Sequence, residues 1–509
     1  MRRQPTSAAP RTLIASAFIL GIACTPTKPA SRPPEPLSAV PGPAPSAALK
    51  PIADTREAVD WAGDIALPGS AMRMIVHLEP DADSTWKGTL DLPQSGLKGH
   101  AIRDLDVSEE GFDFVLAPAG TPEARWVYIA IEHEIDADVG SGTFEQAGQS
   151  FPVEVHRLAA GEEYRPPRPQ TPVAPFPYVT RDLEITQGEI QLACTMVVPK
   201  GDVTYPAVAL LSGSGPQDRD STIFDHKPFA LLADHLARAS IASLRCDDRG
   251  VGGSTGTYRD ATHQMLTKDA LAMVNALAGD ARINPHSIGI IGHSEGGMLA
   301  PLAAAAAPTS VAFIVLLAGP GFSGAEILSQ QSHDIGVAMG KDPAAVERED
   351  RAHRAFVKAL LNGAKKDVIV DKLQALIELQ LAGREIDDAT KTAALNQALD
   401  QMTSPWFTSF IASDPQPALR KLKKTPVLAL GGDLDLQVRA KDNLDAIQRG
   451  LKRARNRDVT TKILPGLNHL FQPALTGTVE EYATIETTLA PAMLELVSSW
   501  INARFHSNS

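Results

Sequence analysis

The segment SIGIIGHSEGGMLAPLAAAAA, from Ser287 to Ala307, holds one serine between two glycines, where an apolar run gives way to an alanine-rich run. Its centre, Gly292-His-Ser294-Glu-Gly296, has the G-x-S-x-G pattern of a nucleophile elbow, in which a strand turns sharply into a helix and exposes the serine hydroxyl. The apolar residues before the serine predict the strand, and Met298 to Ala307 predicts the helix. Glycine has no Cβ atom, so it permits the close backbone approach of such a turn. Ser294 is therefore the candidate nucleophile.

The sequence contains a second match to this pattern, GGSTG around Ser254. Here a strand-like run ends at Cys246, the stretch Asp247 to Gly250 intervenes, and no helical pattern starts directly after the serine. An elbow needs a strand that enters it and a helix that leaves it at once. We therefore interpret Ser254 as part of a glycine-rich loop, and Ser294 as the elbow.

The composition is that of a globular protein, because 43% of the 509 residues are hydrophobic and 21% are charged. The length is sufficient for two or three domains. A formal net charge of −12 argues against a nucleic-acid partner, since phosphate binding needs a basic surface. No cluster of His and Cys has the spacing of metal ligands, and no segment resembles a phosphate or dinucleotide loop. We predict chemistry without a metal or another cofactor.

Residues 1–24 are expected to form a signal peptide. Two arginines supply its charged region, and Leu13 to Ala23 is an apolar run too short to span a bilayer as a helix. The run ends in Leu20-Gly-Ile-Ala-Cys24, which resembles a bacterial lipobox whose Cys24 is acylated, although a glycine stands where Leu or Val is usual. Ordinary cleavage at an A-x-A-like site is the alternative. We expect export to the periplasm or outer cell envelope, with a membrane contact only through a lipid on Cys24.

The next segments predict a tether, a domain and a linker. Residues 25–50 are rich in Pro, Ala and Ser and suit a tether, because they cannot bury a core. From residue 51 to 160 the apolar residues recur with period two, as in the run from Met72 to Leu78. This pattern predicts a small all-β domain, either a barrel or a sandwich. Residues 161–179 contain several prolines and are interpreted as a linker.

From residue 180 to 505, short apolar runs alternate with helical patterns, which predicts an α/β domain with a mostly parallel sheet covered on both faces. Between about residues 322 and 421 the pattern is helical throughout. Such an insertion would form a cap at the carboxyl ends of the strands, where ligands bind in these sheets. Cys194 and Cys246 lie in apolar runs, so they either form one disulfide or pack as buried thiols. We predict no catalytic role for either.

A serine hydroxyl becomes a useful nucleophile when a base takes its proton and a carboxylate orients that base. On an elbow of this kind the three residues follow in the chain order serine, acid, histidine. The strand-like run Val427 to Leu430 is followed by two acids, Asp433 and Asp435, and both are in the right place. Of the later histidines, His506 is close to the chain end, where residues fray, whereas His469 directly follows a predicted strand. We predict His469 as the base.

The reaction also needs an oxyanion hole, a pair of backbone N–H groups directed at the developing negative charge. One N–H should come from Glu295, the residue after the nucleophile. The other should follow the first strand of the α/β domain, where glycines open the run from Ser212 to Asp218. We predict Ser214 for this second donor, with Gly213 and Gly215 as alternatives.

Together these segments resemble a bacterial family of α/β-hydrolases typified by EstD-type carboxylesterases. The resemblance covers about residues 181–504 and is carried by five ordered motifs, which are Ser212-Gly-Ser-Gly-Pro-Gln-Asp-Arg219, Arg245-Cys-Asp-Asp-Arg-Gly-Val-Gly-Gly-Ser254, Gly292-His-Ser-Glu-Gly296, Gly432-Asp-Leu-Asp-Leu-Gln-Val438 and Leu467-Asn-His-Leu-Phe471. It implies an α/β-hydrolase fold and hydrolysis of short acyl esters. In the family pattern the acid is the third residue after the glycine, which selects Asp435 and completes a triad with Ser294 and His469. Ser212 is a departure, because the family commonly has a histidine at this position.

The all-β domain resembles, more loosely, the N-terminal β module of many such proteins. The predicted function is therefore that of an exported carboxylesterase acting on a small-molecule ester. A peptidase, a thioesterase or an acyltransferase could use the same triad, because pocket shape sets the preference for the leaving group. A tethered cell-envelope binding protein with a vestigial hydrolase domain is the alternative of a different class. The sequence leaves the natural substrate and the oligomeric state open.

Overall fold

The computed structural model describes residues 57–159, with gaps at 68–69, 82–84, 93–96, 109, 117–126, 134–137 and 147–148, and residues 167–505, with a gap at 383–387. These residues form two compact units that divide between Pro167 and Arg168. The predicted signal peptide with Cys24, the tether and His506 lie outside the described residues. Within the described ranges, no helix is long and apolar enough to cross a bilayer.

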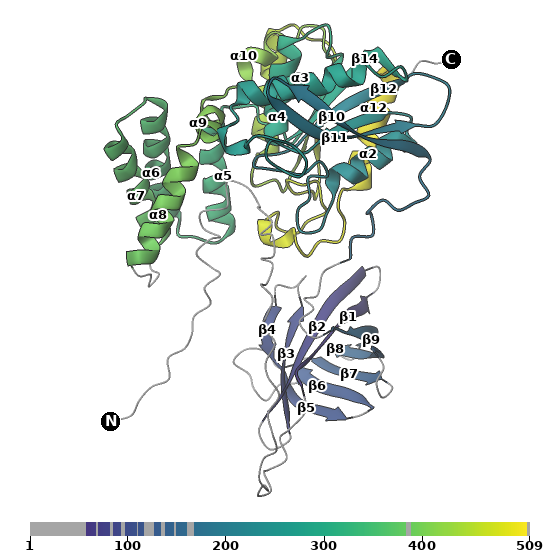
Figure 1. The fold of residues 1–509 in the computed structure, drawn as a ribbon. Helices are drawn as coiled ribbons and strands as arrows, with labels where there is room; N and C mark the ends of the chain where they lie inside the picture. Colours follow the sequence, from purple (N-terminus) through teal and green to yellow (C-terminus); the bar gives the residue numbers. More distant parts are fainter. Residues whose placement is uncertain are drawn as a thin grey trace, which may run out of the picture. The chain divides into compact units, whose positions relative to one another are not determined.

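The first unit, here called the β module, is an antiparallel sheet of nine strands in its described residues, and it is the predicted all-β domain. The strands are β1 (Val59–Leu67), β2 (Ser70–Pro80), β3 (Trp86–Leu92), β4 (Leu97–Ala101), β5 (Arg103–Ser108), β6 (Gly111–Leu116), β7 (Val127–His133), β8 (Val139–Gln146) and β9 (Gln149–Arg157). Their spatial order is β4-β3-β2-β1-β9-β8-β7-β6-β5. Only Ile102 separates the two edge strands in the chain, so the sheet curls and its edges are the halves of one bent strand (Figure 1). Met74, Val76 and Leu78 are buried, as the period-two pattern predicts.

In its described residues, the second unit is built on a mostly parallel sheet of eight strands in the order β10-β11-β13-β12-β14-β15-β16-β17. The strands are β10 (Tyr178–Gln187), β11 (Ile190–Pro199), β12 (Tyr205–Leu211), β13 (Ala242–Cys246), β14 (Ile283–His293), β15 (Phe313–Leu317), β16 (Val427–Gly432) and β17 (Val459–Leu464). The strands from β13 to β17 in this order pair in parallel, and β11 is antiparallel to both of its neighbours.

Helices cover both faces of this sheet, which explains why central strands such as β12 and β15 are continuous apolar runs. In β12, Ala207 and Ala209 belong to the core on one face, whereas Val208 and Leu210 belong to the core on the other. The first core includes residues of α3 (His263–Ala278), α4 (Glu295–Ala306) and α11 (Ala440–Arg453). The second core includes residues of α2 (Pro228–Arg238) and α12 (Pro491–Phe505). The predicted doubly covered sheet is confirmed.

A helical cap is inserted between β15 and β16, as the sequence predicts. Its helices are α5 (Gly324–Ala338), α6 (Pro343–Leu361), α7 (Lys366–Gln380), α8 (Asp388–Met402), α9 (Pro405–Ala412) and α10 (Gln416–Leu419). Figure 1 shows α6, α7 and α8 side by side, away from the sheet, and α9 next to the sheet domain. The helix α9 packs against α3 and against the short 3-10 helix η3 (Tyr258–Asp260), so it connects the cap to the body of the unit.

Two features are visible only in the folded chain. Cys194 on β11 and Cys246 on β13 are cross-strand partners with Cα atoms 3.9 Å apart, and they form a disulfide. This decides between the two alternatives that the sequence leaves open for these cysteines. In addition, the segment from Arg168 onward belongs to the second unit although it lies in the proline-rich stretch 161–179. The Arg168 guanidinium donates hydrogen bonds to the carbonyls of Ile485, at 3.1 Å, and of Ala483, at 2.8 Å.

Candidate active site

Ser294 occupies the sharp turn between β14 and α4. Its backbone has a φ of 53°, in the left-handed region that is uncommon for a residue with a side chain. A Cβ atom on Gly292 would lie 2.1 Å from the Gly296 carbonyl oxygen, and one on Gly296 would lie 2.3 Å from the Leu211 carbonyl oxygen. Both flanking positions therefore require glycine, as an elbow does.

Ser254 has a different environment. Its hydroxyl donates a hydrogen bond to the Asp247 carbonyl at 2.7 Å and accepts one from the Ala193 N–H at 2.9 Å. The side chain is buried within a loop. Both hydrogen bonds join this loop to neighbouring backbone, so Ser254 has a structural role and its hydroxyl is not directed at the candidate site.

The candidate base and acid are in direct contact. His469 Nδ1 lies 2.9 Å from Asp435 Oδ2, and both side chains are buried. The other carboxylate oxygen of Asp435 accepts the N–H groups of Gln437 and Val438, each at 2.8 Å, which fixes the carboxylate in place. Asp433 is exposed, and its carboxylate accepts the Gly466 N–H at 2.6 Å. The structure thus brings Asp435, and not Asp433, to the imidazole.

The His469 loop lies against the elbow. His293, the residue before Ser294, donates from Nε2 to the His469 carbonyl at 2.9 Å, and the two rings have centroids 4.9 Å apart. Desolvation, together with the nearby His469, lowers the pKa of His293 to about 4, so His293 is neutral at pH 7. Among the described residues, no hydrogen bond joins the Ser294 hydroxyl to His469. Catalytic hydrogen bonds of this kind are often long until substrate binds.

The loop that follows β12 runs beside the nucleophile. The Gly296 N–H donates to the Ser212 carbonyl at 3.0 Å, which joins the end of β12 to the first turn of α4. A Cβ atom on Gly213 would lie 3.4 Å from Ser294 Cβ. The Gly215 N–H interacts with the Tyr258 hydroxyl. Gly213, Ser214 and Gly215 all lie on this loop and remain the candidates for the second oxyanion donor.

Part of the chain is similar to known proteins. Residues 226–472 match the family described as serine aminopeptidase, S33. The esterase EstD of Thermotoga maritima is 34% identical over 106 residues, which are 21% of this chain and 25% of that protein. The match thus spans a quarter of the length of this curated relative, and it confirms the resemblance predicted from the motifs.

Among solved structures, Est1E of Butyrivibrio proteoclasticus with bound ferulic acid is 16% identical, covers 63% of this chain and 96% of its own, and has a TM-score of 0.35. An esterase of Pyrococcus furiosus is 14% identical, with coverage of 67% and 98% and a TM-score of 0.39. The strand order, the elbow, the order Ser294, Asp435, His469 and the family match decide the fold. The second unit has the α/β-hydrolase fold.

In the second unit the carboxylate of Glu295 accepts hydrogen bonds from three separate segments, and this cluster is here called the hub at Glu295. The sequence does not indicate it. This carboxylate is 2% exposed. It accepts hydrogen bonds from Tyr258 Oη at 3.0 Å, from His263 Nε2 at 2.7 Å and from Trp406 Nε1 at 2.9 Å. The donors come from η3, from α3 and from the cap helix α9, so the residue after the nucleophile is connected to the cap. Trp406 is buried with Phe407 and Phe410 in the core, and none of these aromatic rings lines the described cavity.

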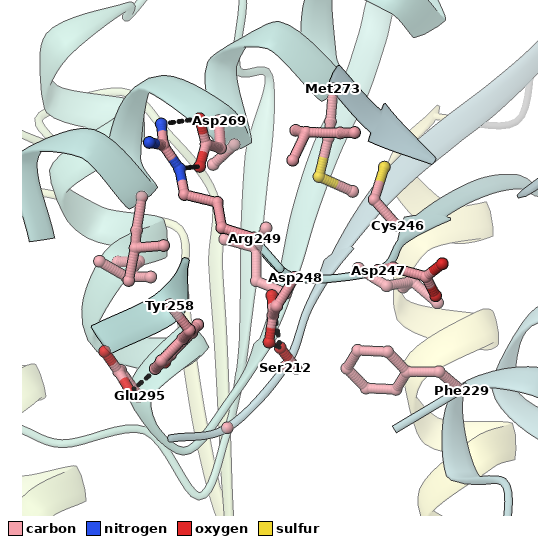
Figure 2. Close-up of a pocket in the computed structure, with 17 residues that line it drawn as sticks. Ser212, Phe229, Cys246, Asp247, Asp248, Arg249, Tyr258, Asp269, Met273 and Glu295 are labelled. Atoms are coloured by element: carbon pink, nitrogen blue, oxygen red, sulfur yellow. Dashed lines mark hydrogen bonds and ion pairs between the residues drawn. The ribbon is translucent and has the colours of Figure 1, made fainter. Parts of the chain in front are cut away.

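A cavity of ≈ 50 Å³ lies behind the elbow, and Figure 2 shows its lining. Ser212, Asp248, Tyr258 and Glu295 contribute polar groups to it. This volume accommodates water and is too small for an acyl chain. Desolvation raises the pKa of Asp248 to about 8, and the pKa of Tyr258 well above its ordinary value. Within the described ranges, no group of three or more His, Cys, Asp or Glu side chains is placed to hold a metal ion.

Proposed function

We propose that this protein is an exported serine hydrolase that cleaves short-chain carboxylic esters through an acyl-enzyme intermediate. The observation that carries the proposal is the 2.9 Å contact between His469 Nδ1 and Asp435, beside a serine held on a strained turn. The 34% identity to an esterase favours an ester as the substrate.

The geometry supports the following sequence of steps. Asp435 accepts the Nδ1–H of His469, which leaves Nε2 unprotonated to take the proton from the Ser294 hydroxyl. The serine oxygen attacks the ester carbonyl, and the N–H groups of Glu295 and Ser214 bind the oxyanion. His469 then gives the proton to the departing alcohol. Water, activated by the same imidazole, releases the acid from Ser294.

A peptidase is the second candidate, because the matched family is described as serine aminopeptidase. The two activities differ in the leaving group, so parallel substrates separate them. We expect hydrolysis of p-nitrophenyl esters of short acyl chains to exceed that of aminoacyl p-nitroanilides and of thioesters. Faster cleavage of the anilides would replace the esterase proposal with the peptidase.

A serine-directed fluorophosphonate tests the enzyme proposal against a binding protein with a vestigial site. We expect labelling at Ser294, and none in Ser294→Ala, whose ester hydrolysis should fall by roughly 10⁴- to 10⁶-fold. Ser254→Ala is the matched control and should still be labelled. Folded wild-type protein that takes no label would support the binding protein.

The export part of the proposal rests on the N-terminal sequence, with Cys24 as the acylated residue. The disulfide between Cys194 and Cys246 supports it, because disulfides persist in oxidising compartments. Metabolic labelling with an alkyne fatty acid in a bacterial host should mark the wild type and leave Cys24→Ala unmarked. A soluble, unmarked protein in the periplasm would indicate ordinary cleavage.

A further inference from the structure

Asp248 holds both ends of the loop from Ser212 to Gln217, which carries the proposed oxyanion donor Ser214. Its Oδ2 atom accepts the Gln217 N–H at 2.9 Å and the Ser212 hydroxyl at 3.1 Å. Figure 2 shows the contact with Ser212 at the wall of the cavity. One carboxyl group therefore joins the residue at which the loop leaves β12 to the residue at which it ends.

The backbone of Asp248 is fixed as well. Its N–H donates to the Gln217 carbonyl at 3.0 Å, so the two residues are joined in both directions. The adjacent Asp247 accepts hydrogen bonds from the Arg219 guanidinium at 2.7 Å and from the Gly253 N–H at 3.0 Å. Hydrogen bonds therefore fix the backbone at Asp247 and Asp248, and this backbone positions the carboxyl group that binds the loop.

We propose that Asp248 is a positioning residue for the oxyanion hole, which sets the direction of the Ser214 N–H by holding the loop at both ends. The inference rests on the proposed function, because it assigns a task within the same reaction. It also explains how the loop is fixed where the related family commonly has a histidine. Here Ser212 supplies a short hydroxyl donor in that place, and Asp248 accepts from it.

Burial and the nearby carboxylates favour the neutral form of Asp248 at pH 7. Burial is the largest cause that raises its pKa to about 8, and the carboxylates of Glu295 on α4 and Asp269 on α3 add to it. Arg249 does not compensate, because its guanidinium is paired with Asp269 at 2.6 and 2.8 Å. Tyr258 faces the same cavity and keeps its proton in this pH range.

The position of Asp248 beside the loop predicts how the rate of attack by Ser294 should change with pH. Ionisation of Asp248 above pH 8 adds a negative charge beside the loop that must bind a developing oxyanion. Two like charges at close range repel each other, and the repulsion raises the energy of the transition state. The rate of attack by Ser294 should therefore fall on the alkaline side, with an apparent pKa near 8.

The test uses the full chain and the rate of fluorophosphonate labelling of Ser294 from pH 5 to 10, alongside kcat and KM for a short p-nitrophenyl ester. Asp248→Asn keeps an acceptor for the loop and cannot ionise. We expect it to stay within about threefold of the wild type at pH 7 and to lose the alkaline fall in both rates. Asp248→Ala releases the loop and should lower kcat by about ten- to a hundredfold with little change in KM.

Two further variants complete the experiment. Ser212→Ala removes only one end of the contact, so its loss of kcat should be smaller than that of Asp248→Ala. Asp433→Asn is the matched control, because it neutralises an exposed loop carboxylate that also accepts a backbone N–H. It should keep the wild-type pH profile.

The inference is overturned if Asp248→Asn retains the alkaline fall of the wild type, or if Asp248→Ala keeps the wild-type kcat and labelling rate. Should Asp248→Ala not fold, as judged by its thermal melt, the pH profile of Asp248→Asn decides. Labelling reports attack by Ser294 whatever the natural substrate is. A failure of ester hydrolysis in the wild type therefore refutes the esterase and leaves the labelling test of Asp248 in force.

Discussion

Asp435 Oδ2 lies 2.9 Å from His469 Nδ1, whereas Asp433, two residues earlier on the same loop, is exposed to solvent. A loop that leaves a strand offers only one of two such acids the buried position beside the imidazole. Asp435 occupies it because the N–H groups of Gln437 and Val438 also bind its carboxylate. This local turn, rather than the chemistry of the acid itself, selects the triad member.

Asp435→Asn should keep the fold and hold His469 in the wrong tautomer, because an amide N–H then faces Nδ1. We expect a loss of about 10³- to 10⁴-fold in kcat. Asp433→Asn should cost less than about tenfold, since it changes one exposed contact with the Gly466 N–H. Steady-state kinetics of the two single variants decide the matter, and a larger loss at Asp433 would reverse the assignment.

The buried carboxylate of Glu295 makes the cap helix α9 a partner of the elbow. Trp406→Phe keeps most of the ring and removes one of three donors to this carboxylate. We expect it to reduce the free energy of unfolding by about 1–3 kcal/mol and to lower kcat several-fold, because the Glu295 backbone is proposed to bind the oxyanion.

Trp500→Phe is the control for this prediction, because it also removes an indole donor, here to Thr460 Oγ1 at 3.2 Å on β17. It should lower stability with little effect on kcat. Equal kinetic effects of the two variants would show that the hub at Glu295 has no special connection with catalysis. Denaturant unfolding and ester kinetics supply the two measurements.

The elbow and the triad order could be predicted because they are local or sequential signals. Gly292 and Gly296 flank Ser294 within one pentapeptide, and a strand followed by an acid or a histidine is visible in the sequence. The hub at Glu295 had no such signal, since its donor Trp406 is 111 positions away along the chain. Neither the hydrophobic pattern nor the spacing of motifs indicates a hydrogen bond between residues so far apart in the sequence.

The sequence also left open whether Cys194 and Cys246 form a disulfide, because that too depends on a contact between distant segments. Cys194 and Cys246 can bond because they are partners in the register of β11 and β13, and sequence alone does not fix a register between distant strands. The role of Asp248 was hidden in the same way. Its position after a strand was visible, but its contact with Gln217 depends on how the loop folds back.

Buried histidines should make the protein less stable in acid. Burial lowers the pKa of His353, in the cap helix α6, to about 4, from an ordinary value of 6.5. The unfolded chain therefore binds a proton between pH 6.5 and 4 that the folded chain does not, and stability is lost as the pH falls through this range. The contribution of one such group is of order 3 kcal/mol. His226 should act in the same direction.

Thermal melting between pH 4.5 and 7.5 checks this prediction. His353→Leu removes the group that titrates, so it should flatten the decline in stability. The Nδ1 atom of His353 has no hydrogen-bond partner, so the substitution loses no hydrogen bond at that atom. His286→Leu, at an exposed position, should leave the decline unchanged. A wild-type melting temperature that is constant across this range would contradict the prediction.

The hydrolase domain should fold and act without the β module, provided that the truncation keeps Arg168. A chain that starts at Pro167 retains the hydrogen bonds from Arg168 to the carbonyls of Ile485 and Ala483. It also retains the bond from Gln170 Nε2 to the Leu489 carbonyl and the bond from the Leu489 N–H to Gln170 Oε1. A chain that starts at Thr180 loses all of them together with the first residues of β10. We expect the chain that starts at Pro167 to hydrolyse small esters at close to the full-length rate.

The chain that starts at Thr180 should melt at a lower temperature, because several backbone carbonyls lose their charged donor. Equal melting temperatures would show that the Arg168 segment is dispensable. Loss of activity in a folded, fluorophosphonate-reactive product that starts at Pro167 would instead place part of the substrate site in the β module.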